Sequence, residues 1–80
     1  MMDRKQIFDT LNGIFRDIFD DPALTVGEET TAAGVEGWDS LTHITLLAAV
    51  EDEFGITFAM KDVVEMKNVG DMASAIEAAL

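Results

Sequence analysis

The chain has 80 residues, of which 49% are hydrophobic, and this length allows one domain with a small core. It carries 16 acidic and 5 basic side chains, for a formal net charge of -11, which disfavours binding to nucleic acid or an anionic membrane surface because both need basic residues. The absence of cysteine excludes disulfides, thiolate metal sites and cysteine nucleophiles within the chain.

The first predicted element is an amphipathic helix over roughly residues 3–19. Its apolar residues recur at spacings of one, three and four, which places them along one side of a helix. They are Ile7, Phe8, Leu11, Ile14, Phe15, Ile18 and Phe19. Pro22 and the two aspartates before it end the pattern, because the residue before a proline avoids helical backbone angles.

Residues 20–38 show no sustained periodicity and are predicted to form a long first loop. A loop of this length in a compact domain is usually functional or packed against the core. Leu24, Val26 and Val35 are spread along it, and we expect them to hold the loop on the core.

The second helix is predicted over residues 40–54, because Asp39 is a good N-cap and Gly55 is a natural residue to follow a helix. We expect its core-facing side to consist of Leu41, Ile44, Leu47, Val50 and Phe54. Further apolar residues widen this arc, so the helix is either central or partly exposed for a partner.

The remaining chain suits shorter elements. Residues 56–58 alternate like a strand but have no partner strand, so we expect an extended connector. Residues 61–66 suit one or two helical turns, and residues 69–79 suit a last helix. The fold class is therefore predicted as all-α, a small four-helix bundle of three main helices and one short helix, forming a single domain over residues 1–80.

Residues for catalysis are scarce. A triad would use Ser40, His43 and Asp39, which lie close together along one helix, but it also needs an oxyanion hole and a pocket. A bundle of this size leaves little volume for them, so we do not expect an enzyme, and we expect His43 to be a surface or boundary residue. The acidic clusters do not match a calcium-binding loop, so no metal site is expected.

Ser40 lies in the first turn of the second helix, directly after its N-cap. Amide N–H groups and the helix dipole there favour a phosphate ester. The same argument applies to the start of any helix, so by itself it indicates only a helix start.

A larger pattern around Ser40 resembles the acyl carrier protein family. It joins Gly37-Trp38-Asp39-Ser40-Leu41, through Ile44 and Leu47, to Val50-Glu51-Asp52-Glu53-Phe54-Gly55-Ile56. Residues 21–26 and 28–31 also resemble that family's first loop, and residues 69–76 its final helix, so the resemblance covers nearly the whole chain.

The resemblance implies a carrier that catalyses nothing. A phosphopantetheinyl transferase would move the 4′-phosphopantetheine of coenzyme A onto Ser40, with Asp39 and Leu41 beside it. The thiol of that group would then carry acyl, aminoacyl or polyketide groups as thioesters to acyl or aminoacyl ligases or synthases. The absence of cysteine fits this function, because the reactive sulfur is imported.

The helix after Ser40 differs from that of typical fatty-acid synthase carriers, which is acidic. Residues 41–50 contain no Asp, Glu, Lys or Arg, which favours a dedicated carrier for a specialised ligase or synthase. Trp38 favours the same interpretation, or it is a hydrophobic lid over the loop. The residues expected to face partners are Thr42, Thr45, Ala48 and Asp52.

The main alternative is an unmodified helical adaptor that binds proteins through the same helix. In both cases we expect a cytoplasmic monomer. No apolar run approaches the roughly 18 residues that span a membrane, and the N-terminal segment lacks the apolar stretch of a signal peptide.

Overall fold

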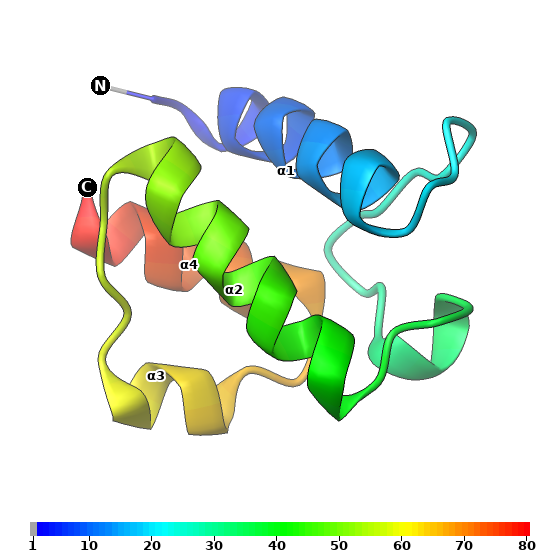
Figure 1. Ribbon diagram of the computed structural model, residues 1–80. Coiled ribbons are helices and arrows are strands. Elements are labelled where there is room, and N and C mark those ends of the chain that lie inside the picture. Colours follow the sequence, from blue (N-terminus) through cyan, green and yellow to red (C-terminus); the bar gives the residue numbers. More distant parts are fainter. Residues whose placement is uncertain (1) are drawn as a thin grey trace.

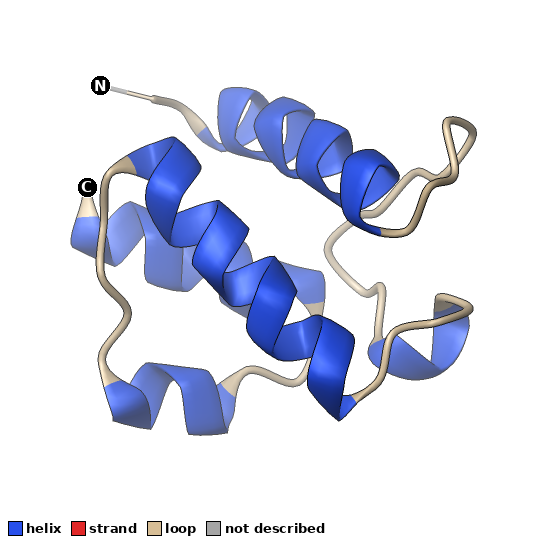
Figure 2. Ribbon diagram, viewed as in Figure 1, coloured by secondary structure: helices blue, strands red, loops and turns tan. Residues whose placement is uncertain are grey.

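The computed structural model describes residues 2–80, so the first residue of the predicted domain lies outside the described part. The elements in chain order are α1 (Arg4–Ile18), a 3₁₀ turn η1 (Ala32–Gly34), α2 (Ser40–Phe54), α3 (Met60–Glu65) and α4 (Val69–Ala79). α1 packs against α2 and α4, and the short α3 packs against α4 (Figure 1). Helices joined by loops account for all of residues 2–80, without a strand (Figure 2). The predicted all-α bundle with a long first loop is confirmed.

The predicted helix bounds agree closely with the structure. α2 and α4 have the predicted bounds, and α1 is one residue shorter at each end because Asp3 and Phe19 are its caps. α3 begins and ends one residue earlier than predicted. Residues 56–58 form an extended connector. The η1 turn was not predicted, because three residues are too few to show a periodicity.

The core is formed by α1, α2, α4 and part of the first loop. Val26 and Val35 of the loop are buried and Leu24 packs at the edge of the core, as predicted. The fully buried large side chains are Ile7, Leu11, Phe15, Leu46, Val50, Val69, Met72 and Ile76.

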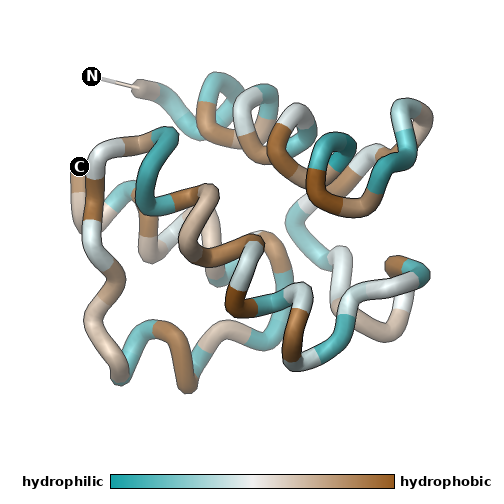
Figure 3. The backbone as a smooth tube through the Cα atoms, viewed as in Figure 1, coloured by the Kyte–Doolittle hydropathy of each residue, from teal (hydrophilic) through white to brown (hydrophobic). Residues whose placement is uncertain are grey.

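The predicted core-facing side of α2 is partly wrong. Leu41 and Ile44 are 76% and 67% exposed, whereas Leu46 and Val50 are fully buried. Apolar residues occur on almost every turn of α2 (Figure 3), so periodicity alone does not select the buried side. The contacts with α1 and the shared core select it instead.

Polar side chains of α1 hold the first loop along the helix. Asn12 accepts the backbone N–H of Val26 at 2.6 Å. The Arg16 Nε donates to the Leu24 carbonyl, also at 2.6 Å. These bonds satisfy loop backbone groups that the core would otherwise leave without partners.

The first loop also caps the start of α4. The backbone N–H of Val69 donates to the Thr30 carbonyl at 2.8 Å, and that of Gly70 donates to the Glu28 carbonyl at 3.0 Å. Two of the amide groups that a helix start leaves free are thereby satisfied. Arg4 reinforces this junction, since its Nε donates to the Glu28 carboxylate at 2.6 Å and lowers the pKa of Glu28.

This close junction predicts opposite effects for two glycine substitutions. A Cβ at Gly70 would lie 2.5 Å from the backbone oxygen of Glu28, whereas a Cβ at Gly13 would meet no atom within 4 Å. We expect Gly70→Ala to lower the free energy of unfolding by about 1–3 kcal/mol through overpacking. Gly13→Ala, the control inside a helix, should raise it by roughly 0.5–1 kcal/mol. Urea unfolding measures both, and a stabilising Gly70→Ala would contradict the described packing.

Candidate functional site

The start of α2 is set by a reciprocal cap between Asp39 and Thr42. The Asp39 carboxylate accepts the backbone N–H groups of Leu41 at 3.0 Å and Thr42 at 2.9 Å. In return, Thr42 Oγ1 accepts the backbone N–H of Asp39 at 2.8 Å and donates to the Gly37 carbonyl. The arrangement satisfies donors that the helix start leaves free.

Gly37 turns the chain into this cap. Its φ is +88°, a left-handed backbone angle that glycine adopts at little cost. After this turn, Trp38 packs at the edge of the core and Asp39 caps α2. The two neighbouring residues therefore differ in burial, since Trp38 is half-buried and Asp39 is exposed.

Ser40 is the first residue of α2, and it is exposed. It therefore presents its side chain at the helix end where amide groups and the helix dipole favour negative charge. The structure places Asp39 and Leu41 on either side of it, and Leu41 is exposed as well. A phosphate ester at this hydroxyl would be in a favourable electrostatic position.

The Asp39 carboxylate is committed to the cap. Its pKa is lowered chiefly by the backbone N–H of Thr42, then by the Thr42 hydroxyl. His43 is committed elsewhere, because its Nδ1 accepts the Trp38 indole N–H at 3.0 Å. Neither residue is arranged to activate Ser40, and the structure gives no support to the triad.

Trp38 packs between the aromatic side chains of α1 and His43. Its ring lies edge-on to Phe15 with centroids 5.2 Å apart, and 6.2 Å from the ring of Phe19. The His43 ring lies beside the indole and nearly coplanar with it, with the centroids 5.9 Å apart and an interplanar angle of 25°. Trp38 is therefore a lid over this end of the core, and His43 is the half-buried boundary residue that the sequence predicts.

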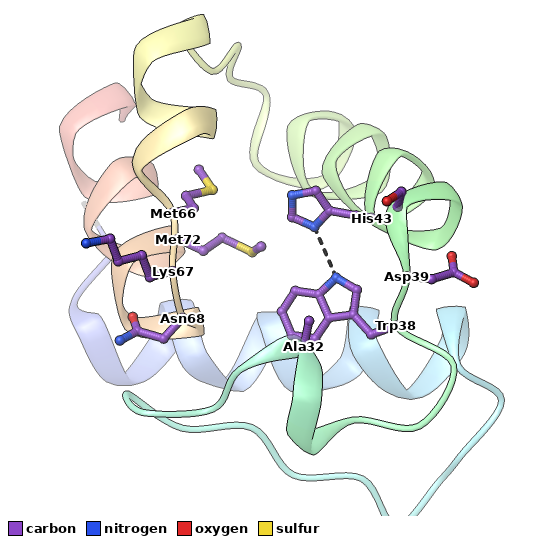
Figure 4. A pocket seen from close by; sticks show the side chains of 9 residues that line it. Ala32, Trp38, Asp39, His43, Met66, Lys67, Asn68 and Met72 are labelled. Atoms are coloured by element: carbon purple, nitrogen blue, oxygen red, sulfur yellow. Dashed lines mark hydrogen bonds between the residues drawn. The ribbon is translucent and has the colours of Figure 1, made fainter.

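A pocket of about 370 Å³ lies beside Ser40. Trp38 and His43 form one wall, and Met66 and Met72 lie opposite them (Figure 4). The remaining lining residues are Ala32, Asp39, Ser40, Lys67 and Asn68. The pocket thus joins the start of α2 to the connection between α3 and α4.

The predicted partner-facing residues fall into two groups. Thr45, Ala48 and Asp52 are exposed along one side of α2, whereas Thr42 is half-buried and uses its hydroxyl in the cap. Sequence reasoning missed Ile44, which is exposed beside Thr45 and Ala48 on the same side. Met60 and Val64 of α3 are also exposed, at 77% and 75%. The excess of apolar residues in α2 was the sequence signal for Ile44, and it gave none for the two residues of α3.

Residues 2–80 hold no cluster of three or more histidine, aspartate or glutamate side chains placed to bind a metal ion. None of the helices in this part of the chain combines the length and the apolar character needed to cross a membrane.

Comparison with known proteins identifies relatives of this chain. The family model described as "Phosphopantetheine attachment site" matches residues 9–76. The chain is 29% identical over 79 residues to acyl carrier protein 3 of Ralstonia nicotianae, covering 99% of this chain and 91% of that protein. It is 32% identical over 69 residues to an acyl carrier protein of Saccharopolyspora erythraea, covering 86% and 73%.

A solved structure has the same fold. The solution NMR structure of the holo acyl carrier protein from Geobacter metallireducens superposes with a TM-score of 0.86 at 37% sequence identity. The match covers 91% of this chain and 84% of that one.

The cap predicts a pH-dependent effect of replacing Asp39. Asp39→Ala removes the acceptor for two amides and should lower the melting temperature at pH 7, whereas Asp39→Asn should lower it less, because asparagine is also a good N-cap. The lowered pKa means that the carboxylate stabilises the fold above the ordinary value of about 3.9 and loses this effect as pH falls toward its folded-state pKa.

Circular dichroism melts from pH 7 down to acidic pH measure this difference. The gap between wild type and Asp39→Ala should narrow on acidification. An unchanged melting temperature at pH 7, or a gap that widens in acid, would contradict the role assigned to the cap.

Proposed function

Because the chain belongs to the acyl carrier protein family, we propose that Ser40 is the residue that bears its covalently attached 4′-phosphopantetheine. The protein is a carrier and not a catalyst. The prosthetic group supplies a thiol on which acyl intermediates are carried as thioesters. The observation that carries the proposal is the exposed hydroxyl of Ser40 at the first position of α2, directly after the Asp39 cap.

The residues around Ser40 fit such a group. Asp39 is held in the cap, so its side chain is bonded to the helix amides and leaves the serine accessible. The helix dipole favours the phosphodiester that attachment creates. Exposed Leu41 adjoins the attachment point and offers an apolar contact to the arm or to the transferase.

Attachment is a phosphoryl transfer by a phosphopantetheinyl transferase. Ser40 Oγ forms a bond to the phosphorus nearest the pantetheine of coenzyme A, and the P–O bond to the second phosphate breaks. Adenosine 3′,5′-bisphosphate leaves, and the hydroxyl proton passes to a base of the transferase. Ser40 needs only to be reachable in this step, and its position at the end of a helix meets that requirement.

Acyl carrier proteins in general interact with such transferases and with synthases. We propose that these partners dock along the exposed side of α2 that includes Thr45, Ala48 and Asp52, and that Leu41 and Ile44 take part. The net charge of -11 would steer the carrier to basic surfaces, and small, weak contacts would let it pass between partners.

The apolar character of this side supports a narrower assignment. Residues 41–50 carry no Asp, Glu, Lys or Arg, so partners would recognise the first turns of α2 through apolar contacts. We therefore propose a dedicated carrier that serves a specialised acyl or aminoacyl ligase or synthase, acting as a one-domain monomer in the cytoplasm.

Modification in vitro tests the attachment site. Apo-protein incubated with coenzyme A and a promiscuous phosphopantetheinyl transferase should gain the mass of one phosphopantetheine. Ser40→Ala should abolish the gain completely. Ser74, the other serine of the chain, is exposed on α4 and accepts a hydrogen bond from Arg4, so Ser74→Ala is the control and should be modified as wild type is.

Two results would contradict the proposal. The native protein could stay unmodified with several such transferases, or Ser40→Ala could still gain the mass. Partner binding that survives Ser40→Ala in an unmodified protein would indicate an adaptor instead.

A further inference from the structure

Trp38 lies between the pocket beside Ser40 and the aromatic residues of α1, while Met72, itself fully buried, forms part of the opposite wall. The indole lines the pocket and also contacts Phe15, which is fully buried. Phe19 also lies against the indole. A group that entered the core from the Ser40 side along Trp38 would have to displace the indole from these aromatic contacts, which are worth more than their buried area alone.

His43 fixes the orientation of that ring. Its Nδ1 accepts the indole N–H at 3.0 Å, and the two rings are inclined by only 25°. Nδ1 therefore carries no hydrogen in this contact. This nearly coplanar hydrogen bond restrains the indole from swinging away from Phe15.

The pocket that remains is small. Its volume of about 370 Å³ is at the lower end of the roughly 300–1,000 Å³ that is usual for ligand sites. Two aromatic rings face the thioethers of Met66 and Met72 across it (Figure 4), and thioethers adapt well to compact apolar groups.

We propose that Trp38, positioned by His43, closes the core to the carried group and confines it to this surface pocket, so that the carrier is selective for short or compact acyl groups. The inference rests on the proposed attachment of phosphopantetheine at Ser40. Ser40 is one of the residues that line the pocket. A long aliphatic chain gains no further burial in this protein and extends into solvent.

Carriers loaded with acyl groups of different length test the proposal. The apo-protein is loaded by the transferase from acetyl-, butyryl- or octanoyl-coenzyme A, and intact mass verifies each product. Thioester cleavage by hydroxylamine and the melting temperature are then measured. We expect the octanoyl thioester to be cleaved no more slowly than the acetyl thioester, with no rise in melting temperature. In Trp38→Ala, octanoyl should be cleaved several-fold more slowly than acetyl.

Variants at His43 test whether this residue positions Trp38 or only contributes to the stability of the fold. His43→Asn keeps a hydrogen-bond acceptor for the indole and should behave as wild type toward octanoyl. His43→Phe keeps an aromatic ring at this position without the acceptor and should begin to protect octanoyl. Trp38 is the only tryptophan of the chain, so its emission reports on the wall directly. It should change in His43→Phe relative to wild type and stay the same in His43→Asn.

Each failure has its own signature. No gain of mass from any acyl-coenzyme A overturns the attachment at Ser40 together with this inference. Normal loading followed by strong protection of octanoyl in wild type, with a higher melting temperature, overturns the closed core alone. A Trp38 emission in His43→Phe that is identical to that of wild type overturns the positioning role of His43.

Discussion

The Asp39 carboxylate accepts the amide N–H groups of Leu41 and Thr42, and these two hydrogen bonds define where α2 begins. The position of Ser40 depends on them, because a helix that began elsewhere would present a different residue at its first position. Thr42 makes the cap reciprocal and ties it to Gly37. A few bonds among neighbouring residues therefore place the attachment point on an otherwise ordinary helix.

The same cap divides two environments. Before it, Trp38 packs on Phe15 and Phe19 and belongs to the edge of the core; after it, Ser40 and Leu41 are exposed. A carrier needs a packed core that holds the helix in place and an exposed hydroxyl that a transferase can reach. The rest of α2 also has a buried side and an exposed side: Leu46 and Val50 are buried, whereas Ile44 is exposed.

Much of this arrangement was predictable from local sequence signals. Periodicity and capping residues determine helix ends, so the bounds of α2 and α4 were predicted without error. The buried side of α2 was not, because apolar residues surround the helix and only its packing against α1 and the shared core selects a side. Two other features were not predictable in this way: the close approach of Gly70 to Glu28 and the hydrogen bond from Trp38 to His43. Both depend on the path of the first loop, whose sequence shows no periodicity.

The central claim is that this carrier works through one covalent arm on Ser40. It is tested most directly in the cell, by tandem mass spectrometry of peptides from the protein purified out of its native host. The account predicts that the peptide containing Ser40 bears a phosphopantetheine and that fragment ions assign it to this residue. A protein that is unmodified in growing cells, or modified at any other residue, would contradict the account.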